Sequence, residues 1–371
     1  MVRRPSRRAY IGQWVLLAGV VAFGWLLADM VAGNYARKNL HFGFGFLADQ
    51  AHFDLPFHLI SWNLFDTYGR VLLVCLLNTV LVAAMAIVTA TVLGLLVGVM
   101  RLSVNWLVRN IALAFIEFVR NTPQLVQLIF WYVGVLQTLP SPRQSITLPG
   151  GVLLNIRGLF VPDAVMREGS GLLSWLALAV LIATPFVWRV KIGSSRVGAK
   201  ALFLLLLALV LFAAGVDHVE YPVLQGFNLA GGTQVPPELV ALWIGLSIYA
   251  TAFIAEIVRG SIEAIPKGQH EAAQALGLKG LQRLFLVVLP QALRIMVPQL
   301  TSQYLNIIKS TTLGAAVGYS ELMQIFAGTV MQQAAKEAET MAIVMAIFVG
   351  INLATSALMN WYNRRVALVE R

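Results

Sequence analysis

The chain has 371 residues, of which 58% are hydrophobic and only 12% charged, and its net charge is +10. A typical soluble domain carries about 25% charged residues. With a mean hydropathy of +0.77, this composition excludes an ordinary soluble protein and indicates an integral membrane protein. The single cysteine, Cys75, excludes a disulfide framework or a cysteine zinc site within the chain.

Apolar runs long enough to cross about 30 Å of hydrocarbon recur along the whole sequence. The first could be a signal peptide, because four arginines precede it. We expect an uncleaved anchor, since the run is too long for a signal core and no A-x-A site follows Ala28. The fold class predicted is all-α, with about eight transmembrane helices at residues 11–32, 71–100, 121–139, 171–188, 201–216, 237–258, 291–310 and 340–362.

Lysine and arginine are unevenly distributed between the two sets of loops that eight crossings would create. With the N-terminus inside, the inside segments hold many more bases than acids, whereas the outside segments hold more acids than bases. This asymmetry predicts that both termini are cytoplasmic. The bases lie at membrane boundaries, where anionic lipid attracts them, so the charge of +10 does not require a nucleic-acid partner.

The outside segments 33–69 and 140–170 are long, the first rich in aromatic residues and the second in proline. Neither shows the periodicity of a separately folded domain. We expect caps packed at the membrane surface, with a substrate-binding module as the alternative for each.

The motifs of common enzyme classes are absent from the sequence. No Gly-Lys dipeptide occurs, so there is no G-x-x-x-x-G-K-[ST] phosphate loop. No G-x-S-x-G elbow, zinc cluster or dinucleotide turn occurs either, and no cofactor or metal is predicted. We therefore expect a transport protein rather than an enzyme, powered by an ion gradient or by a separate ATPase.

Residues 263–290 form a polar segment between two apolar spans. Pro266 suits the first position of a short helix, and Glu271 is predicted in its first turn, near the positive end of the dipole. Ala272, Ala273 and Ala275 would let another surface approach closely, and Gly277 could end the helix in the left-handed conformation. The alternative is an ordinary interfacial hairpin.

Glu271-Ala272-Ala273, Gly277 and the Val287-x-Leu289-Pro290 sequence have a spacing that resembles the coupling-loop signature of permease subunits in ATP-binding-cassette (ABC) importers. Val287 stands where that family usually has isoleucine. The resemblance implies that this loop docks in a cleft of the ATPase, with Glu271, Ala272, Ala273 and Gly277 as the coupling residues.

A second segment, Phe118–Leu128, is similar to the R-[GN]-T-P-L-L-V-Q-L sequence of polar amino-acid (histidine/glutamine-type) permeases, with Gln124 replacing the first leucine. These resemblances cover about 74–139 and 238–362. The remainder looks like the long permease chains of general L-amino-acid transporters. The resemblance implies a type I importer core with an extra first helix and a two-helix insertion, located in the bacterial inner membrane. The implied partners are two copies of an ATPase, a second permease chain and a periplasmic amino-acid-binding protein, besides membrane lipid.

Polar residues within the seventh predicted span recur at helical spacing and so share one face. Such residues are expensive in lipid and line a cavity or a partner helix, and both interpretations remain open. Around the third span, Arg120 could be neutralised by Glu117, while the Asn-Thr-Pro sequence breaks the helix and frees backbone groups for a zwitterion. The candidate substrate-pathway residues are Arg120, Asn121, Thr122, Gln303, Asn306 and Lys309.

Four regions are predicted: an anchor and periplasmic segment at 1–70, the first half of the permease core at 71–139, the insertion at 140–236, and the second half at 237–371 with the coupling loop 259–290. Two other classes are weighed. An ion-coupled secondary transporter would show inverted repeats, and an intramembrane enzyme would place reactive side chains near the interface. Neither feature is visible in the sequence.

Overall fold

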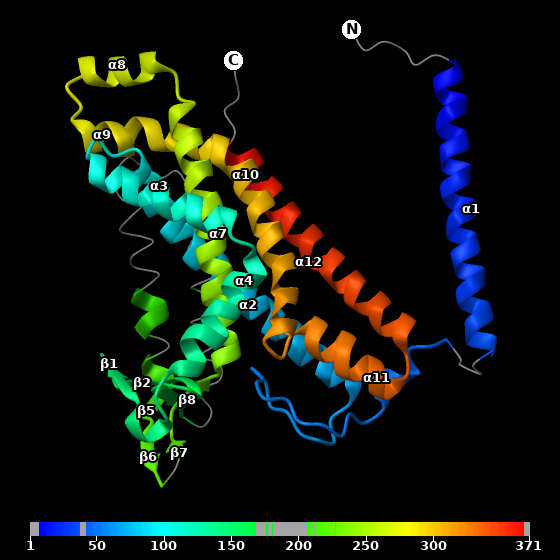
Figure 1. The fold of residues 1–371 in the computed structure, drawn as a ribbon. Helices are drawn as coiled ribbons and strands as arrows, with labels where there is room; N and C mark the ends of the chain where they lie inside the picture. Colours follow the sequence, from blue (N-terminus) through cyan, green and yellow to red (C-terminus); the bar gives the residue numbers. More distant parts are fainter. Residues whose placement is uncertain are drawn as a thin grey trace.

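Figure 1 shows the fold, a computed structural model that describes residues 7–37, 42–167, 176, 180, 206–210, 213–226 and 228–366. Long helices dominate it and run between two ends of the molecule. One end carries a short helix and the other carries the β-strands, and we call them the α8 end and the strand end. The long helices are α1 (Arg7–Arg37), α2 (Tyr68–Arg101), α7 (Pro237–Glu263), α10 (Leu289–Ser310) and α12 (Glu337–Val366).

Four of the described helices, α1, α2, α7 and α12, are long and apolar enough to cross a membrane. They correspond to the first, second, sixth and eighth predicted spans. The seventh forms α10, whose 22 residues reach about 33 Å at 1.5 Å per residue. The fourth prediction, 171–188, lies almost wholly outside the described residues. Of the fifth, 201–216, the described parts are helical at 206–210 and 213–215.

The third predicted span, 121–139, begins later than expected. Thr122 is extended, with ψ 129°, because proline at 123 disfavours the helical region for the residue before it. The helix then resumes at Gln124 and changes its winding twice. Its segments are α4 (Gln124–Ile129), the π-helical η2 (Phe130–Val135) and the 3-10 turn η3 (Leu136–Thr138).

Residues that the prediction left between two spans form an additional helix, α3 (Trp106–Asn121). The Asn105 side chain caps it, accepting hydrogen bonds from the backbone N–H groups of Leu107 at 2.9 Å and Val108 at 3.3 Å. Only one face of α3 is buried, through residues that recur every three or four positions: Ala112, Ile116 and Val119. The prediction missed α3 because charged and polar residues interrupt its apolar sequence, which is therefore not typical of a membrane span.

The all-α prediction is wrong for part of the insertion at 140–236, whose described residues include eight short strands. Strands β1, β2, β3 and β8 form one antiparallel sheet, while β4–β5 and β6–β7 form two-stranded sheets. The bounds are β1 (Ile146–Leu148), β2 (Val152–Asn155), β3 (Gly158–Val161), β4 (Asp163–Met166), β5 (Val216–Glu220), β6 (Val223–Gln225), β7 (Asn228–Ala230) and β8 (Thr233–Val235).

These strands have three to five residues each, too few for alternation to emerge from an apolar background. The sequence feature that indicates these strands is the glycine in the turns between them. Gly150 and Gly151, with φ of 83° and 78°, connect β1 to β2, a conformation that glycine adopts without penalty. Pairing of Leu159 with Val235 joins β3 to β8. The insertion therefore begins and ends in one sheet, directly before α7.

Helices α2 and α7 pack closely along their length and form the centre of the molecule. A Cβ atom on Gly94 would lie 2.4 Å from Ile254 Cγ2, and one on Gly98 would lie 2.7 Å from Val258 Cβ. The Gly94-x-x-x-Gly98 sequence thus allows the backbones of α2 and α7 to approach closely.

A second core lies near the strand end and joins distant segments. Phe46 and Leu55 from residues 42–67 pack with the first turns of α2 and with Phe326. Phe326 belongs to the π-helical η7 (Leu322–Val330), which leads into α11 (Met331–Ala334). The aromatic-rich segment is therefore a packed cap, as expected from the sequence.

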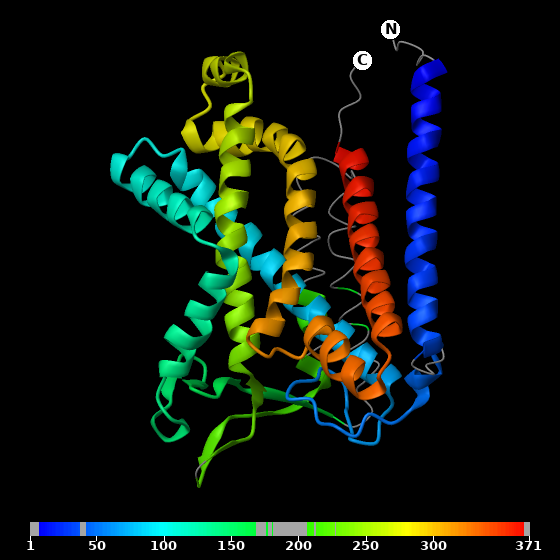
Figure 2. The same cartoon turned by 45° about the vertical axis from the view of Figure 1, so that its right-hand side comes forward.

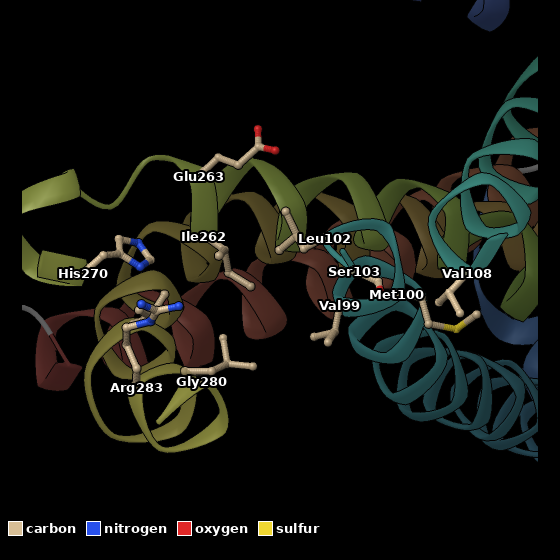
Figure 3. A pocket seen from close by; sticks show the side chains of 12 residues that line it. Val99, Met100, Leu102, Ser103, Val108, Ile262, Glu263, His270, Gly280 and Arg283 are labelled. Atoms are coloured by element: carbon tan, nitrogen blue, oxygen red, sulfur yellow. The ribbon is translucent and has the colours of Figure 1, made fainter. Parts of the chain in front are cut away.

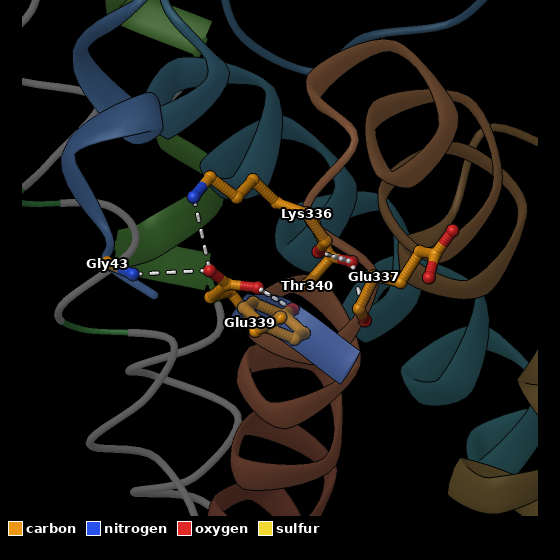
Figure 4. A network of polar contacts seen from close by, with 6 residues as sticks. Gly43, Lys336, Glu337, Glu339 and Thr340 are labelled. Carbon is orange, nitrogen blue, oxygen red and sulfur yellow. Dashed lines mark hydrogen bonds and ion pairs between the residues drawn. The ribbon is translucent and has the colours of Figure 1, made fainter. Parts of the chain in front are cut away.

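Helix α1 stands apart from the others and is linked to α12 at the strand end (Figures 1 and 4). The Tyr35 hydroxyl donates to Glu339 Oε2 at 2.6 Å, and the Gly43 N–H donates to Oε1 at 3.2 Å. Lys336 Nζ lies 3.4 Å from the same carboxylate. Glu339 is fully buried, so these contacts satisfy a charge that could not otherwise leave water.

Candidate functional site

The segment with the sequence signature folds into a short helix at the tip of the α8 end (Figures 1 and 2). This helix, α8 (Lys267–Ala275), follows the last turn of α7, and Pro266 precedes it as the N-cap. Glu271 is therefore the fifth residue of α8, and the prediction that it lies in the first turn is wrong. Because the helix begins one residue after Pro266, the carboxylate lies beyond the turn where the dipole acts most strongly.

Gly277 ends α8 as predicted. Its φ of +77° is left-handed, its N–H bonds to the Gln274 carbonyl at 2.9 Å, and the Leu278 N–H bonds to the Ala273 carbonyl at 3.1 Å. This pair of bonds is the Schellman motif, which satisfies carbonyls that the last turn leaves open. The short helix is thus fixed at its C-terminal end by backbone geometry.

The faces of α8 are unequally exposed. Glu271, Ala272 and Ala275 face outward, but Ala273 is only 2% exposed and packs inward. The expectation that all three alanines offer a surface to a partner is therefore wrong for Ala273. Leu276, which the sequence analysis did not single out, is 81% exposed beside Gly277. The sequence could have indicated this exposure, because Leu276 is an apolar residue directly before the glycine that ends a polar helix.

One polar contact joins this tip to a long helix, and a second group of contacts stabilises the end of α7. The Gln291 Nε2 donates to Gln269 Oε1 at 3.0 Å, which joins α8 to the first turn of α10. At the end of α7, Arg259 pairs with Glu256 at 2.9 Å and with Glu263 at 2.5 Å. The connection from α8 to α10 runs through α9 (Gly280–Arg283) and the π-helical η5 (Leu284–Val288), against which α8 packs.

The polar face of α10 lies next to the start of α4. Gln303, Asn306 and Ser310 line a cavity of about 90 Å³, together with Gln124, Tyr249 and Phe253. The Ser310 hydroxyl lies 3.2 Å from Gln124 Oε1. Two of the predicted pathway residues, Gln303 and Asn306, therefore meet, whereas Lys309 is exposed and does not line this cavity. Tyr249 and Phe253 were missed because their sequence context is simply that of a span.

Arg120, a predicted pathway residue from the first half of the core, contacts Phe253, one of the residues that line this cavity. Its guanidinium lies 5.3 Å from the centroid of the Phe253 ring, a cation–π contact. The suggested pairing of Arg120 with Glu117 is not found among the described contacts. Instead, Asn121 Nδ2 donates to Glu117 at 3.3 Å, because Arg120 turns toward α7.

The helix break at Pro123 frees backbone carbonyl groups, but the Gln127 side chain already forms hydrogen bonds with two of them. Gln127 Nε2 donates to the carbonyls of Val119 at 2.8 Å and Thr122 at 3.1 Å. The Thr122 hydroxyl itself bonds back to the Phe118 carbonyl at 2.8 Å. Gln127 is only 7% exposed, so these bonds mainly stabilise the kink, which leaves fewer open groups than the sequence implied.

Comparison with known proteins identifies the class. Residues 199–368 match the family described as the inner membrane component of binding-protein-dependent transport systems. The chain is 44% identical to YhdX of Escherichia coli K12, named as an amino-acid ABC transporter permease, over 99% of this chain and 96% of that one. It is 41% identical to the general L-amino acid transport system permease protein AapQ of Rhizobium johnstonii, over 99% and 94%.

One transport system contributes two relatives. The glutamate/glutamine/aspartate/asparagine permease proteins BztB and BztC of Rhodobacter capsulatus are 36% and 28% identical. They match over 96% and 51% of this chain and over 92% and 49% of their own lengths. Among solved structures, a crystal structure of an amino acid ABC transporter with histidines has the same fold, with a TM-score of 0.50 at 19% identity over 80% of this chain and 95% of that one.

The helical bundle with its projecting short helix is thus the multi-pass, inner-membrane permease component of a binding-protein-dependent transport system. More narrowly, the chain belongs to the amino-acid ABC transporter permeases, and its similarity to AapQ extends through the insertion that distinguishes the long chains.

Proposed function

We propose that this chain moves L-amino acids across the inner membrane as one permease of an ABC importer, and that α8 receives the motion of a separate ATPase. The observation that carries the proposal is the exposed tip formed by Glu271, Ala272 and Leu276, held by the Schellman turn at Gly277. A short helix with small side chains and a fixed end can transmit force without deforming. Ala273 supports the tip from inside rather than touching the ATPase.

The proposed complex contains two copies of the ATPase, a second permease chain and a periplasmic amino-acid-binding protein, with lipid around the spans. The two permeases of the Bzt system support a second chain. The cavity at Gln303 and Asn306 supports it as well. Its volume of about 90 Å³ is well below the roughly 300 Å³ of a small ligand pocket, so one chain supplies only part of a passage.

We place the amino acid's path along the polar face of α10. Gln303 and Asn306 offer amide donors and acceptors, and Arg120 supplies a positive charge next to Phe253. Asn121 and Thr122 belong to the kink that shapes this side, and Lys309 lies at the end of the same helix. A carboxylate and an ammonium group could be bound here by hydrogen bonds, without strong selection of the side chain.

We also propose that the α8 end is cytoplasmic. The start of α1 and the end of α12 lie at that end in both views (Figures 1 and 2), which agrees with the basic residues near both termini. The strand end, with the insertion, would then face the periplasm, where a binding protein delivers its cargo.

The test is uptake of a labelled amino acid by proteoliposomes that contain this chain, the second permease, the ATPase and the binding protein. We expect uptake only with ATP inside the compartment that holds the ATPase. Omission of the ATPase should abolish it. Uptake by this chain alone under a sodium or proton gradient would contradict the proposal and favour an ion-coupled secondary transporter.

A further inference from the structure

A cavity of about 580 Å³ lies between α8, α9 and η5 on one side and the ends of α2 and α7 on the other (Figure 3). This volume is within the range of small-molecule sites. The lining comes from the end of α2, the start of α3, the last turn of α7, and α8, α9 and η5. Most of it is apolar, through Val99, Met100, Leu102, Val108, Leu284 and Val288.

The titratable side chains of the cavity are concentrated at one end. His270 and Arg283 lie there, and the carboxylate of Glu263 is directed away from them (Figure 3). Glu263 is also paired with Arg259 at 2.5 Å, so it does not balance Arg283. In the described part of the chain, no acidic side chain pairs with either Arg283 or His270.

A third basic residue lies next to the lining. Arg101 stands between Met100 and Leu102, and its Nε is buried without a hydrogen-bond partner in the described structure. A buried donor that lacks an acceptor is costly. The cavity therefore combines an apolar interior with two basic side chains, Arg283 and His270, at its edge, and Arg101 follows a lining residue in the sequence.

We propose that this cavity binds an anionic phospholipid, with one acyl chain against the apolar lining and the phosphate at Arg283 and His270. The cavity lies where α2 and α7 reach the membrane boundary, and basic pockets between helices at such boundaries bind anionic headgroups. A soluble anion would leave the apolar lining unfilled, and a neutral lipid would leave Arg283 without a counter-charge. The bound lipid would wedge η5 against α2 and α3 and so set the position of α8.

The assembled complex, with its partner subunits, should be incubated with phosphatidylglycerol that carries a photoactivatable group near the end of one acyl chain. Trypsin cleaves after Arg101 and Arg109, so residues 102–109, which include the lining residues Leu102, Ser103 and Val108, are recovered as one peptide. We expect this peptide to be labelled about fivefold more by phosphatidylglycerol than by the phosphatidylcholine analogue, the difference that one basic residue contributes.

Three variants locate the headgroup and the chain. Arg283→Gln should lower phosphatidylglycerol labelling about fivefold, whereas Lys279→Gln, an exposed base of the same segment that does not line the cavity, should leave it unchanged. Val108→Trp should reduce labelling by both lipids. Equal labelling in Arg283→Gln and wild type would overturn the proposal. So would labelling of the isolated chain but not of the complex, which would mean that a partner protein fills the cavity. Because the readout is lipid binding, it does not depend on the transport test.

Discussion

At Gly277 the backbone lies in the left-handed region, with φ +77° and no heavy atom within 4 Å of where a Cβ would be. Space alone would therefore permit a side chain, and the backbone conformation is what favours glycine. In the left-handed region a larger residue costs about 1–3 kcal/mol. The requirement at this position is thus local, which is why the sequence could predict it.

We expect Gly277→Val to impair transport while the complex still assembles. A β-branched residue would shift the turn out of the left-handed region and lower the population of the correctly ended helix about tenfold, for a penalty near 1.4 kcal/mol. Amino-acid uptake and ATP hydrolysis by the reconstituted complex should be measured together with assembly.

The matched control is Gly280→Ala, because Gly280 is nearby, exposed and not in the left-handed region. It should retain wild-type transport. If Gly277→Val transports as well as Gly280→Ala, then α8 does not transmit motion from the ATPase and its assignment as the coupling element is wrong.

Other residues could not be assigned from the sequence because their partners are distant. Gln127 bonds to carbonyls five and eight positions earlier, across the helix break, and in the sequence it is one more polar residue of a span. Ala273 is indistinguishable from Ala272 until the helix is placed on η5, where only Ala273 is buried. Exposure of residues in one helix depends on what the helix packs against.

Among the elements, α10 connects the tip of the molecule to the polar cavity. Its first turn bonds to α8 through Gln291 and Gln269, and its last turn contacts α4 through Ser310 and Gln124. Midway, the hydroxyl of Tyr304 lies 2.9 Å from that of Thr91 on α2. α10 is continuous from Leu289 to Ser310, with Pro298 in its interior, and it is held at both ends, so displacement of α8 would reach the cavity along α10.

The contact between Gln269 and Gln291 can be tested with charge. In Gln269→Glu with Gln291→Glu, two carboxylates would repel at the junction and separate α8 from α10. We expect the amount of amino acid transported per ATP hydrolysed to fall about fivefold, as for loss of about 1 kcal/mol. Both rates should be measured in the same proteoliposomes.

The comparison variant, Gln269→Glu with Gln291→Lys, removes the same two amides but places opposite charges together. It should keep a transport-to-hydrolysis ratio close to wild type. A ratio that drops equally in both double variants would show that the amides act in another way, and no change in either would show that this contact does not position α8.

The sequence could predict the long helices better than the short elements. Spans such as α2 and α7 are long and predominantly apolar, so a few polar residues within them do not prevent their recognition. The strands of the insertion have only three to five residues each, too few for alternation to be recognised. They exist because distant segments pair, as β3 does with β8 across more than seventy residues, and pairing of that kind leaves almost no local trace.

The whole molecule has two unlike ends. The α8 end carries α8 itself and the loop before α3, where Val104 is fully exposed. The strand end carries the insertion, where Tyr221 is 54% exposed. The separation of the two ends in both views (Figures 1 and 2) makes the orientation directly measurable.

In a Cys75→Ser background, single cysteines at positions 104 and 276 should react with a membrane-impermeant maleimide only from the cytoplasmic side. A cysteine at 221 should react only from the periplasmic side. Intact spheroplasts and inverted vesicles give the two accessibilities. Cys75 is buried and should react little, and its replacement by serine removes any background labelling. Reaction of position 276 in intact spheroplasts would reverse the proposed orientation.

The sequence by itself determined the class of the protein, the main spans and the short helix that ends at Gly277, because each depends on composition or on neighbours a few residues apart. Only the tertiary structure decided which alanine of α8 is buried, that Arg120 faces Phe253 rather than Glu117, and that the insertion forms sheets. Those features depend on contacts between residues far apart in the chain, whose energies are set by packing and not by local propensity.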